Sequence, residues 1–254
     1  MPITHQAPPA IKVELSTNEP LLTVEDLFFT YPTGRTALHG ISFKQSSGEK
    51  VALVGHNGSG KSTLLLNLIG ILNGEGNIRV AGLELTEENL PIIRSKVGLV
   101  FQNPDDQLFS PTVFADVAFG PIHLGYSEEE TIKRVESALS AVGMSDYSNR
   151  LSYHLSAGEK KRISIATVLS MDPDIIVLDE PTAGLDPKAR RSLINLLREL
   201  PQGMLVATHD LLMVKELFPR TIILHQGTIA ADGPTQTILG DTALLETHGL
   251  EMPL

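Results

Sequence analysis

Residues 55–62 read Gly55-His56-Asn57-Gly58-Ser59-Gly60-Lys61-Ser62. A short apolar run, residues 51–54, comes directly before them, and residues 63–69 follow without glycine or proline. These flanks predict a strand, a glycine-rich loop and a helix. The pattern G-x-x-x-x-G-K-[ST] at such a junction is typical of a phosphate-binding loop.

The glycines of this loop allow backbone N–H groups to turn inward around phosphate oxygens, because no Cβ stands in the way. The helix that starts after Gly60 adds free N–H donors and the positive end of its dipole. We expect Lys61 to reach the β- and γ-phosphates and the Ser62 hydroxyl to hold Mg²⁺. A turn that binds nothing is the alternative, and the three fixed positions disfavour it. The residues expected to bind the nucleotide here are Gly55, His56, Asn57, Gly58, Ser59, Gly60, Lys61, Ser62 and Thr63.

Composition limits the classes of function. The chain has 254 residues, a formal net charge of −10 and no cysteine. The acidic balance disfavours nucleic-acid binding by bulk electrostatics, and no run approaches the roughly 18 apolar residues of a membrane-spanning helix. Residues 1–20 hold four prolines and lack the apolar core of a signal peptide, so we expect a flexible tail. The sequence predicts a soluble, cytoplasmic protein that can still sit against a membrane protein.

The order of expected elements indicates an α/β fold with a mainly parallel core. Residues 21–31 and 37–45 predict paired N-terminal strands, which we assign to an antiparallel β subdomain. A long helical stretch between Gln102 and Pro173 predicts an inserted α-helical subdomain at about residues 103–173, within one domain over residues 21–254. Its two expected helices begin at Ser127 and near Ser156. Further strands are expected at residues 51–54, 77–81, 97–101, 175–178, 204–208, 221–224 and 228–231.

A pair of carboxylates ends the apolar strand at residues 175–178. Asp179 at this place can hold Mg²⁺ through water, which is the Walker B role. Glu180 is the natural general base for an attacking water molecule. The alternative is two carboxylates at a strand end that face solvent, and the preceding apolar run in a chain with a phosphate loop disfavours it.

The segment Leu155-Ser156-Ala157-Gly158-Glu159, followed by Lys160-Lys161-Arg162, resembles the signature motif of ATP-binding-cassette (ABC) ATPases. In that family the motif is LSGGQ, and it lies upstream of the Walker B strand, as here. Ser156 with Glu159 also matches a helix capping box. The two interpretations are compatible, since a capped helix N-terminus is a good anion site.

The resemblance to the ABC family extends from about residue 21 to residue 231 and implies roles for other residues. Gln102 matches the Q-loop glutamine, a ligand of Mg²⁺ and water, and His209 matches the switch histidine at the γ-phosphate. Asp186 matches the D-loop, and Tyr31 matches the aromatic residue that stacks on adenine. Each has a structural alternative: a polar strand end, a structural histidine, a helix N-cap and an ordinary tyrosine.

The signature departs from the family pattern at two positions. Ala157 replaces a glycine and adds a methyl group where the loop approaches a phosphate. Glu159 replaces glutamine and adds negative charge near the nucleotide. We expect this charge to weaken binding modestly unless a neighbour such as Lys160 offsets it.

The stretch Val100-Phe101-Gln102-Asn103-Pro104-Asp105-Asp106-Gln107-Leu108-Phe109 resembles the Q-loop region of energy-coupling-factor (ECF) importer ATPases, especially those of cobalt and nickel uptake. In that family this surface receives arginine-bearing coupling helices of the transmembrane subunit. Asp105 and Asp106 either meet such arginines or form a solvated acidic turn. The eight histidines form no i, i+4 pair, so we expect the cargo metal not to bind this chain.

The resemblance implies an ATPase that uses ATP and Mg²⁺ at the cytoplasmic face of the membrane. Two subunits, most simply a homodimer, would place each nucleotide between one phosphate loop and the Ser156 helix of the other subunit. The expected partners are transmembrane transporter subunits and no nucleic acid. Glu180 would activate water, with support from His209, Gln102 and Lys61.

Several alternatives stay open on sequence alone. The cargo could be a vitamin such as biotin, and the dimer could form with a paralogue. Rival classes are a soluble ABC ATPase that acts on nucleic acid or ribosomes, a P-loop kinase or GTPase, and a regulatory module that no longer hydrolyses ATP. Glu180 argues against the last, and the segment at residues 155–159 argues against a kinase or GTPase.

Overall fold

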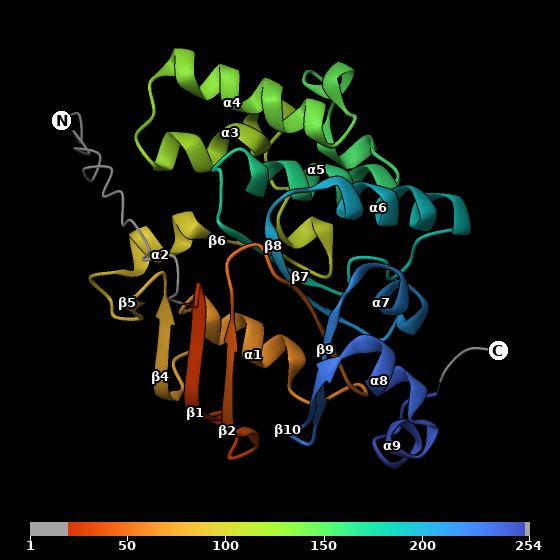
Figure 1. Ribbon diagram of the computed structural model, residues 1–254. Helices are drawn as coiled ribbons and strands as arrows, with labels where there is room; N and C mark the ends of the chain where they lie inside the picture. Colours follow the sequence, from red (N-terminus) through yellow and green to blue (C-terminus); the bar gives the residue numbers. More distant parts are fainter. Residues whose placement is uncertain (1–19, 252–254) are drawn as a thin grey trace.

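A computed structural model describes residues 20–251. The predicted tail at residues 1–20 lies, apart from Pro20, outside the described residues. The chain forms two sheets with helices packed around them (Figure 1). The strands are β1 (Leu22–Thr30), β2 (Thr36–Gln45), β3 (Lys50–Val54), β4 (Glu75–Val80), β5 (Leu83–Glu84), β6 (Val97–Val100), β7 (Ile175–Asp179), β8 (Gly203–Thr208), β9 (Arg220–His225) and β10 (Thr228–Pro234).

The larger sheet has six strands in the order β10-β9-β3-β8-β7-β6. Strands β9, β3, β8, β7 and β6 run parallel, and only β10 pairs antiparallel, with β9. The smaller sheet, β2-β1-β4-β5, is antiparallel throughout. The predicted fold class, a mainly parallel core with an antiparallel N-terminal sheet and inserted helices, is confirmed.

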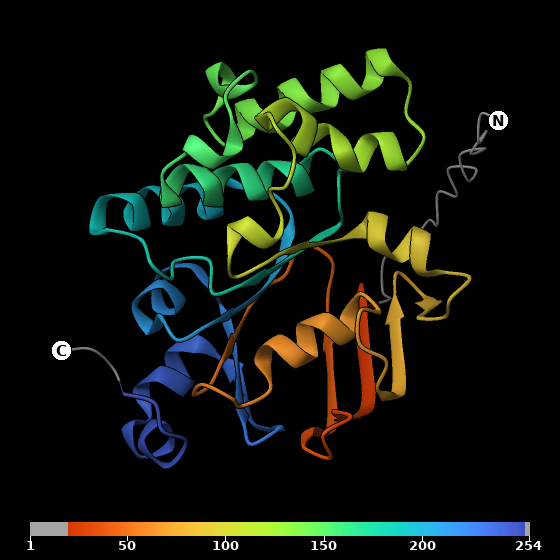
Figure 2. The ribbon, with the colours of Figure 1, turned by 180° about the vertical axis from the view of Figure 1, so that it is seen from behind.

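The parallel sheet separates two hydrophobic clusters, because successive side chains of a strand point to opposite faces. In β3, Ala52 and Val54 belong to one cluster while Val51 and Leu53 belong to the other. One cluster is covered by the antiparallel sheet and by α1 (Lys61–Leu68), which lies beside its strands in Figure 2. Strands buried on both faces explain why the sequence shows continuous apolar runs here and no alternation.

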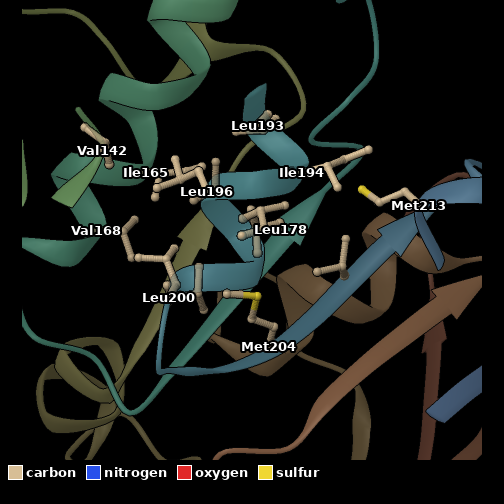
Figure 3. Packing of buried hydrophobic residues seen from close by; sticks show 14 of the residues in the cluster. Val142, Ile165, Val168, Leu178, Leu193, Ile194, Leu196, Leu200, Met204 and Met213 are labelled. Atoms are coloured by element: carbon tan, nitrogen blue, oxygen red, sulfur yellow. The ribbon is translucent and has the colours of Figure 1, made fainter. Parts of the chain in front are cut away.

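The other cluster lies under the remaining helices. In Figure 3, Leu178 of β7 lies near Leu196 of α6 (Pro187–Glu199), and Met204 of β8 lies beside Leu200, the C-cap of that helix. The C-terminal side is completed by α7 (Leu211–Leu217), α8 (Thr235–Gly240) and α9 (Thr242–Thr247). Among residues 20–251, no helix is long and apolar enough to cross a membrane.

Helices α3 (Val113–His123), α4 (Glu128–Ala141) and α5 (Ala157–Leu169) gather at one end of the molecule, at the top of Figure 1. They fall within the range of about 103–173 that the sequence assigns to a helical subdomain. α5 approaches the sheet closely, since a Cβ on Gly98 of β6 would lie 1.9 Å from Cγ1 of Val168. Three short 3₁₀ turns, at Pro104–Asp106, Ser145–Tyr147 and Ser152–His154, complete this part.

Two helices have no counterpart in the sequence prediction. α2 (Leu90–Lys96) carries Pro91 in its first turn, and α3 carries Gly120 and Pro121 in its last turns. Glycine and proline are both unfavourable in helix interiors, which hid the pattern of α3. Packing overrides this preference: a Cβ at Gly120 would lie 2.6 Å from Cγ of Met171, so the missing side chain allows close contact.

Candidate active site

The loop between β3 and α1 has the shape that the glycines predict. Gly58 and Gly60 adopt φ angles of +81° and +108°, which side chains with a Cβ rarely adopt. A Cβ on Gly55 would lie 2.2 Å from the carbonyl oxygen of Leu224. The backbone therefore wraps tightly at the start of α1, where its free N–H groups can meet an anion.

The ammonium of Lys61 lies across this loop. Its Nζ donates to the carbonyl oxygens of Gly55 at 2.7 Å and His56 at 3.2 Å, and lies 4.0 Å from Oε1 of Glu180. Burial lowers the pKa of Lys61, while the charges of Glu180 and Asp179 raise it. The side chain is thus held beside the loop and close to the carboxylates.

An open cleft of about 540 Å³ lies over the loop. It brings together most of the residues that the sequence predicts for nucleotide, Mg²⁺ and catalysis. Those that line it are Tyr31, Asn57, Gly58, Gly60, Lys61, Ser62, Thr63, Gln102, Asp179, Glu180 and His209.

Three predicted residues of the loop do not line this cleft: Gly55, His56 and Ser59. Ser59 is 1% exposed, and its Oγ has no hydrogen-bond partner. His56 contributes instead to a separate hollow next to residues 249–251. Its side chain thus lies outside the phosphate-loop cleft, and its contact with the nucleotide stays a prediction.

Histidines that are scattered in the sequence meet here. The ring of His56 lies 5.3 Å from the ring of His225, which lies 4.8 Å from that of His248. Nevertheless, among residues 20–251 no group of three or more His, Cys, Asp or Glu side chains is arranged to hold a metal ion.

Asp179 fits the chemistry of a magnesium site. Its Oδ1 atom is buried and has no hydrogen-bond partner. Burial raises the pKa of this carboxyl, and a hydrogen bond from Ser62 and the charges of Lys61 and Lys161 oppose the rise. A buried carboxylate oxygen next to a serine hydroxyl is the hard-oxygen set that Mg²⁺ prefers.

Glu180 is 6% exposed, and its carboxylate faces His209. Its Oε2 atom lies 2.8 Å from Nδ1 of His209 and accepts the backbone N–H of His209 at 3.3 Å. The residue has a φ of +44°, in the left-handed region that costs energy for a side chain with a Cβ. The backbone is thus strained at the place where a general base would act.

Ser156 forms the predicted capping box at the start of α5. Its Oγ accepts the N–H of Glu159 at 3.4 Å, and Glu159 Oε2 accepts the N–H of Ser156 at 2.8 Å. The other oxygen, Oε1, accepts the Tyr147 hydroxyl at 2.6 Å. These bonds, that of Tyr147 first, lower the pKa of Glu159.

Lys160, the neighbour that could have offset the charge of Glu159, does not pair with it. Lys160 Nζ instead pairs with Oδ1 of Asp105 at 2.6 Å. The negative charge of Glu159 is stabilised by the hydroxyl and backbone donors of Tyr147 and Ser156 and by the nearby charge of Arg150, and within residues 20–251 it forms no ion pair. Asp106 accepts a hydrogen bond from Asn103 at 3.3 Å, so both predicted acidic residues have partners within the chain.

Ser156, Gly158, Glu159 and Asp186 do not line the cleft of their own chain. Asp186 is the N-cap of α6 and accepts the N–H groups of Lys188 and Ala189 at 2.9 Å. Asp186 therefore has the structural role of a helix N-cap, and its role in the D-loop stays a prediction. The four residues lie on helix starts outside the phosphate-loop cleft.

Lys161 is a site residue that the sequence did not single out. It is 4% exposed, and its Nζ donates to the carbonyl oxygen of Gln102 at 2.5 Å and of Glu180 at 3.3 Å. Burial lowers its pKa to about 8, against the charges of Asp179 and Glu180. One ammonium on α5 thus connects the Q-loop and the end of β7.

Asp210 and Arg190 are a second pair that sequence reasoning missed. Arg190 forms two hydrogen bonds with the Asp210 carboxylate, at 2.7 and 2.6 Å. Asp210 also accepts from Thr182 at 3.1 Å and caps α7 through the N–H of Met213 at 3.0 Å. Burial raises the pKa of Asp210, but these hydrogen bonds and the charge of Arg190 outweigh burial and lower it. The residue after His209 is therefore fixed to α6 and α7.

A partly apolar groove of about 490 Å³ lies on another side of the molecule, between β6, α3 and α5. Phe109 and Phe119 line it, are 67% and 44% exposed, and pack edge to face at 5.1 Å. Val168 and Met171, at the end of α5, form part of its floor. Exposed aromatic side chains in one groove are typical of an interaction surface.

The phosphate loop, the buried carboxylates and the histidine in one cleft define an ATPase of the P-loop class. The sequence profile of the family described as ABC transporter matches residues 38–183. The chain belongs to this family of ABC transporter ATP-binding proteins, and it is an ATPase.

The chain is similar to several members of the family. An ABC transporter ATP-binding protein of Gloeobacter violaceus, gll0289, is 56% identical over 93% of this chain and 98% of that protein. The energy-coupling factor transporter ATP-binding protein EcfA of Methanothermobacter thermautotrophicus is 46% identical over 92% of this chain and 77% of that protein.

Two solved structures show the same fold. That of cbiO1 from Clostridium perfringens, part of the ABC transporter complex cbiONQ, has a TM-score of 0.80 and 36% identity, with 92% of this chain and 96% of that chain covered. The dimeric structure of the bacterial ABC transporter cassette MJ0796 has a TM-score of 0.75 and 28% identity, with 84% and 98% covered.

Proposed function

We propose that this chain is the ATP-hydrolysing subunit of an ECF-type membrane importer, and that the importer carries cobalt or nickel ions. The observation that carries the enzymatic part is the cleft in which Lys61, Ser62, Asp179, Glu180 and His209 meet over the phosphate loop. The similarity to EcfA and cbiO1 supports the transporter class. The resemblance of residues 100–109 to metal-importer ATPases supports the cargo.

The residues divide the chemistry of hydrolysis between them. Tyr31 lines the side of the cleft that receives the base, and the loop and Lys61 bind the phosphates. Ser62, Asp179 and Gln102 would hold Mg²⁺, which supplies positive charge against the phosphate oxygens. Glu180 takes the proton of the attacking water, and His209, 2.8 Å away, fixes the orientation of that carboxylate.

A second subunit would complete each site. Ser156, Gly158, Glu159 and Asp186 lie outside the cleft of their own chain, so they are available to a nucleotide held by another copy. The similarity to a dimeric ABC cassette supports this head-to-tail arrangement. A homodimer would have two equivalent sites, since one chain carries both halves.

The groove with Phe109 and Phe119 is the surface that we assign to the transmembrane subunit. It is partly apolar and includes Asp106 in its lining, which suits a helix with both apolar and basic residues. Binding there would place the protein peripherally at the cytoplasmic face of the membrane. The net charge of −10 is in accord with a protein partner and not with nucleic acid.

The test has two stages. The tagged chain is expressed with its genomic neighbours, and the detergent-solubilised complex is purified and identified by mass spectrometry. We expect transmembrane subunits and a second ATPase subunit; a stable association with nucleic acid or ribosomes contradicts the transporter assignment. The complex is then placed in liposomes, and ATP-dependent uptake of labelled Co²⁺, Ni²⁺ and biotin is compared. Uptake of biotin without either metal contradicts the proposed cargo and leaves the ECF class intact.

A further inference from the structure

The turn between β1 and β2 lies directly on the phosphate loop. It is closed by two backbone hydrogen bonds, from Tyr31 N–H to the Arg35 carbonyl and from Gly34 N–H to the Tyr31 carbonyl, both at 2.9 Å. The Tyr31 hydroxyl is 2.8 Å from Oγ1 of Thr63 in α1. The carbonyl oxygen of Ala37 would lie 2.8 Å from a Cβ on Gly60. The turn therefore has a fixed position beside the first turn of α1.

Arg35 is the cation that this turn brings to the cleft. Its guanidinium Nη2 lies 3.4 Å from the place that a Cβ on Gly58 would occupy, and its side chain lines the cleft together with Lys61 and Ser62. Within residues 20–251, Arg35 forms no ion pair and no side-chain hydrogen bond. Other arginines of the chain are committed to partners, such as Arg190 to Asp210 and Arg220 to Asp232.

We propose that Arg35 binds the polyphosphate of the nucleotide and thereby selects di- and triphosphates over nucleosides. This inference rests on the proposed function, because it assigns a further ligand contact to the same ATP site. A guanidinium presents five N–H donors in a planar fork that matches phosphate oxygens. The free donors of Arg35 lie beside Gly58, which belongs to the part of the loop that binds phosphate.

The surroundings explain why a further cation is needed here. The half-buried Asp179 and the buried Glu180 line the cleft, and the whole chain carries a net charge of −10. Both features oppose the approach of a polyanion. Contact of Arg35 with the adenine ring of the nucleotide is disfavoured. Its guanidinium is directed toward Gly58, and in the described part of the chain no cation–π contact joins it to Tyr31.

The test measures the affinity of the full-length protein for ADP, AMP and adenosine by displacement of a fluorescent ADP analogue, in wild type, Arg35→Gln and Arg35→Lys. We expect Arg35→Gln to weaken ADP binding about 10-fold and to change adenosine binding less than twofold. The affinity of this variant for ADP should also depend less on salt concentration than that of wild type. Arg35→Lys should restore part of the affinity. Arg79→Gln is the matched control, since Arg79 is also exposed and has no ion pair, but lies on β4 away from the cleft.

Three results overturn the inference: ADP binding by Arg35→Gln equal to that of wild type, an equal loss for ADP and adenosine, or a loss for Arg79→Gln as large as for Arg35→Gln. Circular dichroism of each variant establishes that it is folded. The proposed function fails in a different way, namely if wild type itself does not bind ADP or if Lys61→Ala binds it normally.

Discussion

The Nδ1 atom of His209 lies 2.8 Å from Oε2 of Glu180, and the backbone N–H of His209 reaches the same oxygen. The predicted switch histidine and the predicted base thus form one unit, in which the residue after β8 orients the residue after β7. Because Glu180 is buried and His209 is exposed, the histidine is the member of the pair that can respond to a nucleotide.

Glu180→Gln is expected to retain ATP binding and to lower turnover by at least about 100-fold, because glutamine keeps the shape but cannot accept the proton of water. Phosphate release by the purified protein measures turnover, and gel filtration with ATP measures the locked dimer. Glu136→Gln, an exposed position on α4, is the control. Hydrolysis at the wild-type rate would exclude Glu180 as the base.

Ser156→Ala is expected to lose most ATPase activity in the assembled transporter while costing about 1 kcal/mol of stability, the usual effect of a lost N-cap. Ser127→Ala provides a close control, because Ser127 caps α4 through the N–H of Glu130 at 3.3 Å and lies outside the signature. If both variants lose similar stability and only Ser156→Ala loses activity, the result would support a nucleotide site shared across the dimer. Full activity of Ser156→Ala would refute it.

Lys161→Met is expected to lower kcat several-fold with little change in KM, because the ammonium fixes the backbone at Gln102 and Glu180 but does not line the cleft. Steady-state kinetics of the assembled transporter measure both constants. Lys161→Arg should recover part of the rate, since it retains a donor. A rise in KM with unchanged kcat would show that Lys161 affects ground-state binding instead.

Arg190→Met is expected to lower the free energy of unfolding by about 2 kcal/mol, because it leaves the Asp210 carboxylate without its bidentate partner. The loss should depend on pH. The folded-state pKa of Asp210 is below its unfolded value, so its stabilising contribution is complete above about pH 4 and disappears as the pH falls through the lowered pKa. Urea denaturation between pH 3 and pH 7 tests this.

Arg191→Met is the control for that experiment. Arg191 pairs with Glu216, but its side chain is 53% exposed, so the loss should stay below about 1 kcal/mol. Equal losses for the two variants, or a loss for Arg190→Met that grows as the solution becomes acidic, would contradict the role given to the Asp210 pair.

Local patterns predicted those parts of the site that depend on neighbours in sequence. The glycines set the loop, the capping box set the start of α5, and the apolar run at residues 175–178 set a strand that is buried on both faces. Other parts depend on distant residues. Lys161 meets Gln102 across 59 positions, and the sequence around either residue gives no indication of the other.

The partner of Glu159 is likewise a residue distant in sequence. Lys160 is the neighbour of Glu159 in sequence, but on a helix adjacent residues point in different directions. Tyr147, 12 positions away, is the residue whose hydroxyl meets the carboxylate after the chain folds back. Helix α3 was missed because contact with Met171 compensates for the low propensity of Gly120 and Pro121.

Helix α5 joins the signature segment to the groove with Phe109 and Phe119. Ser156 caps its first turn, while Thr167 and Val168, near its last turn, line the groove with Phe109 and Phe119. Its 13 residues form a rod about 20 Å long, and it packs closely against Gly98 of β6. If the membrane partner binds the groove as proposed, a tilt of this rigid helix at the groove would displace the signature, so the force from the partner and the closing of the nucleotide site would share one moving part.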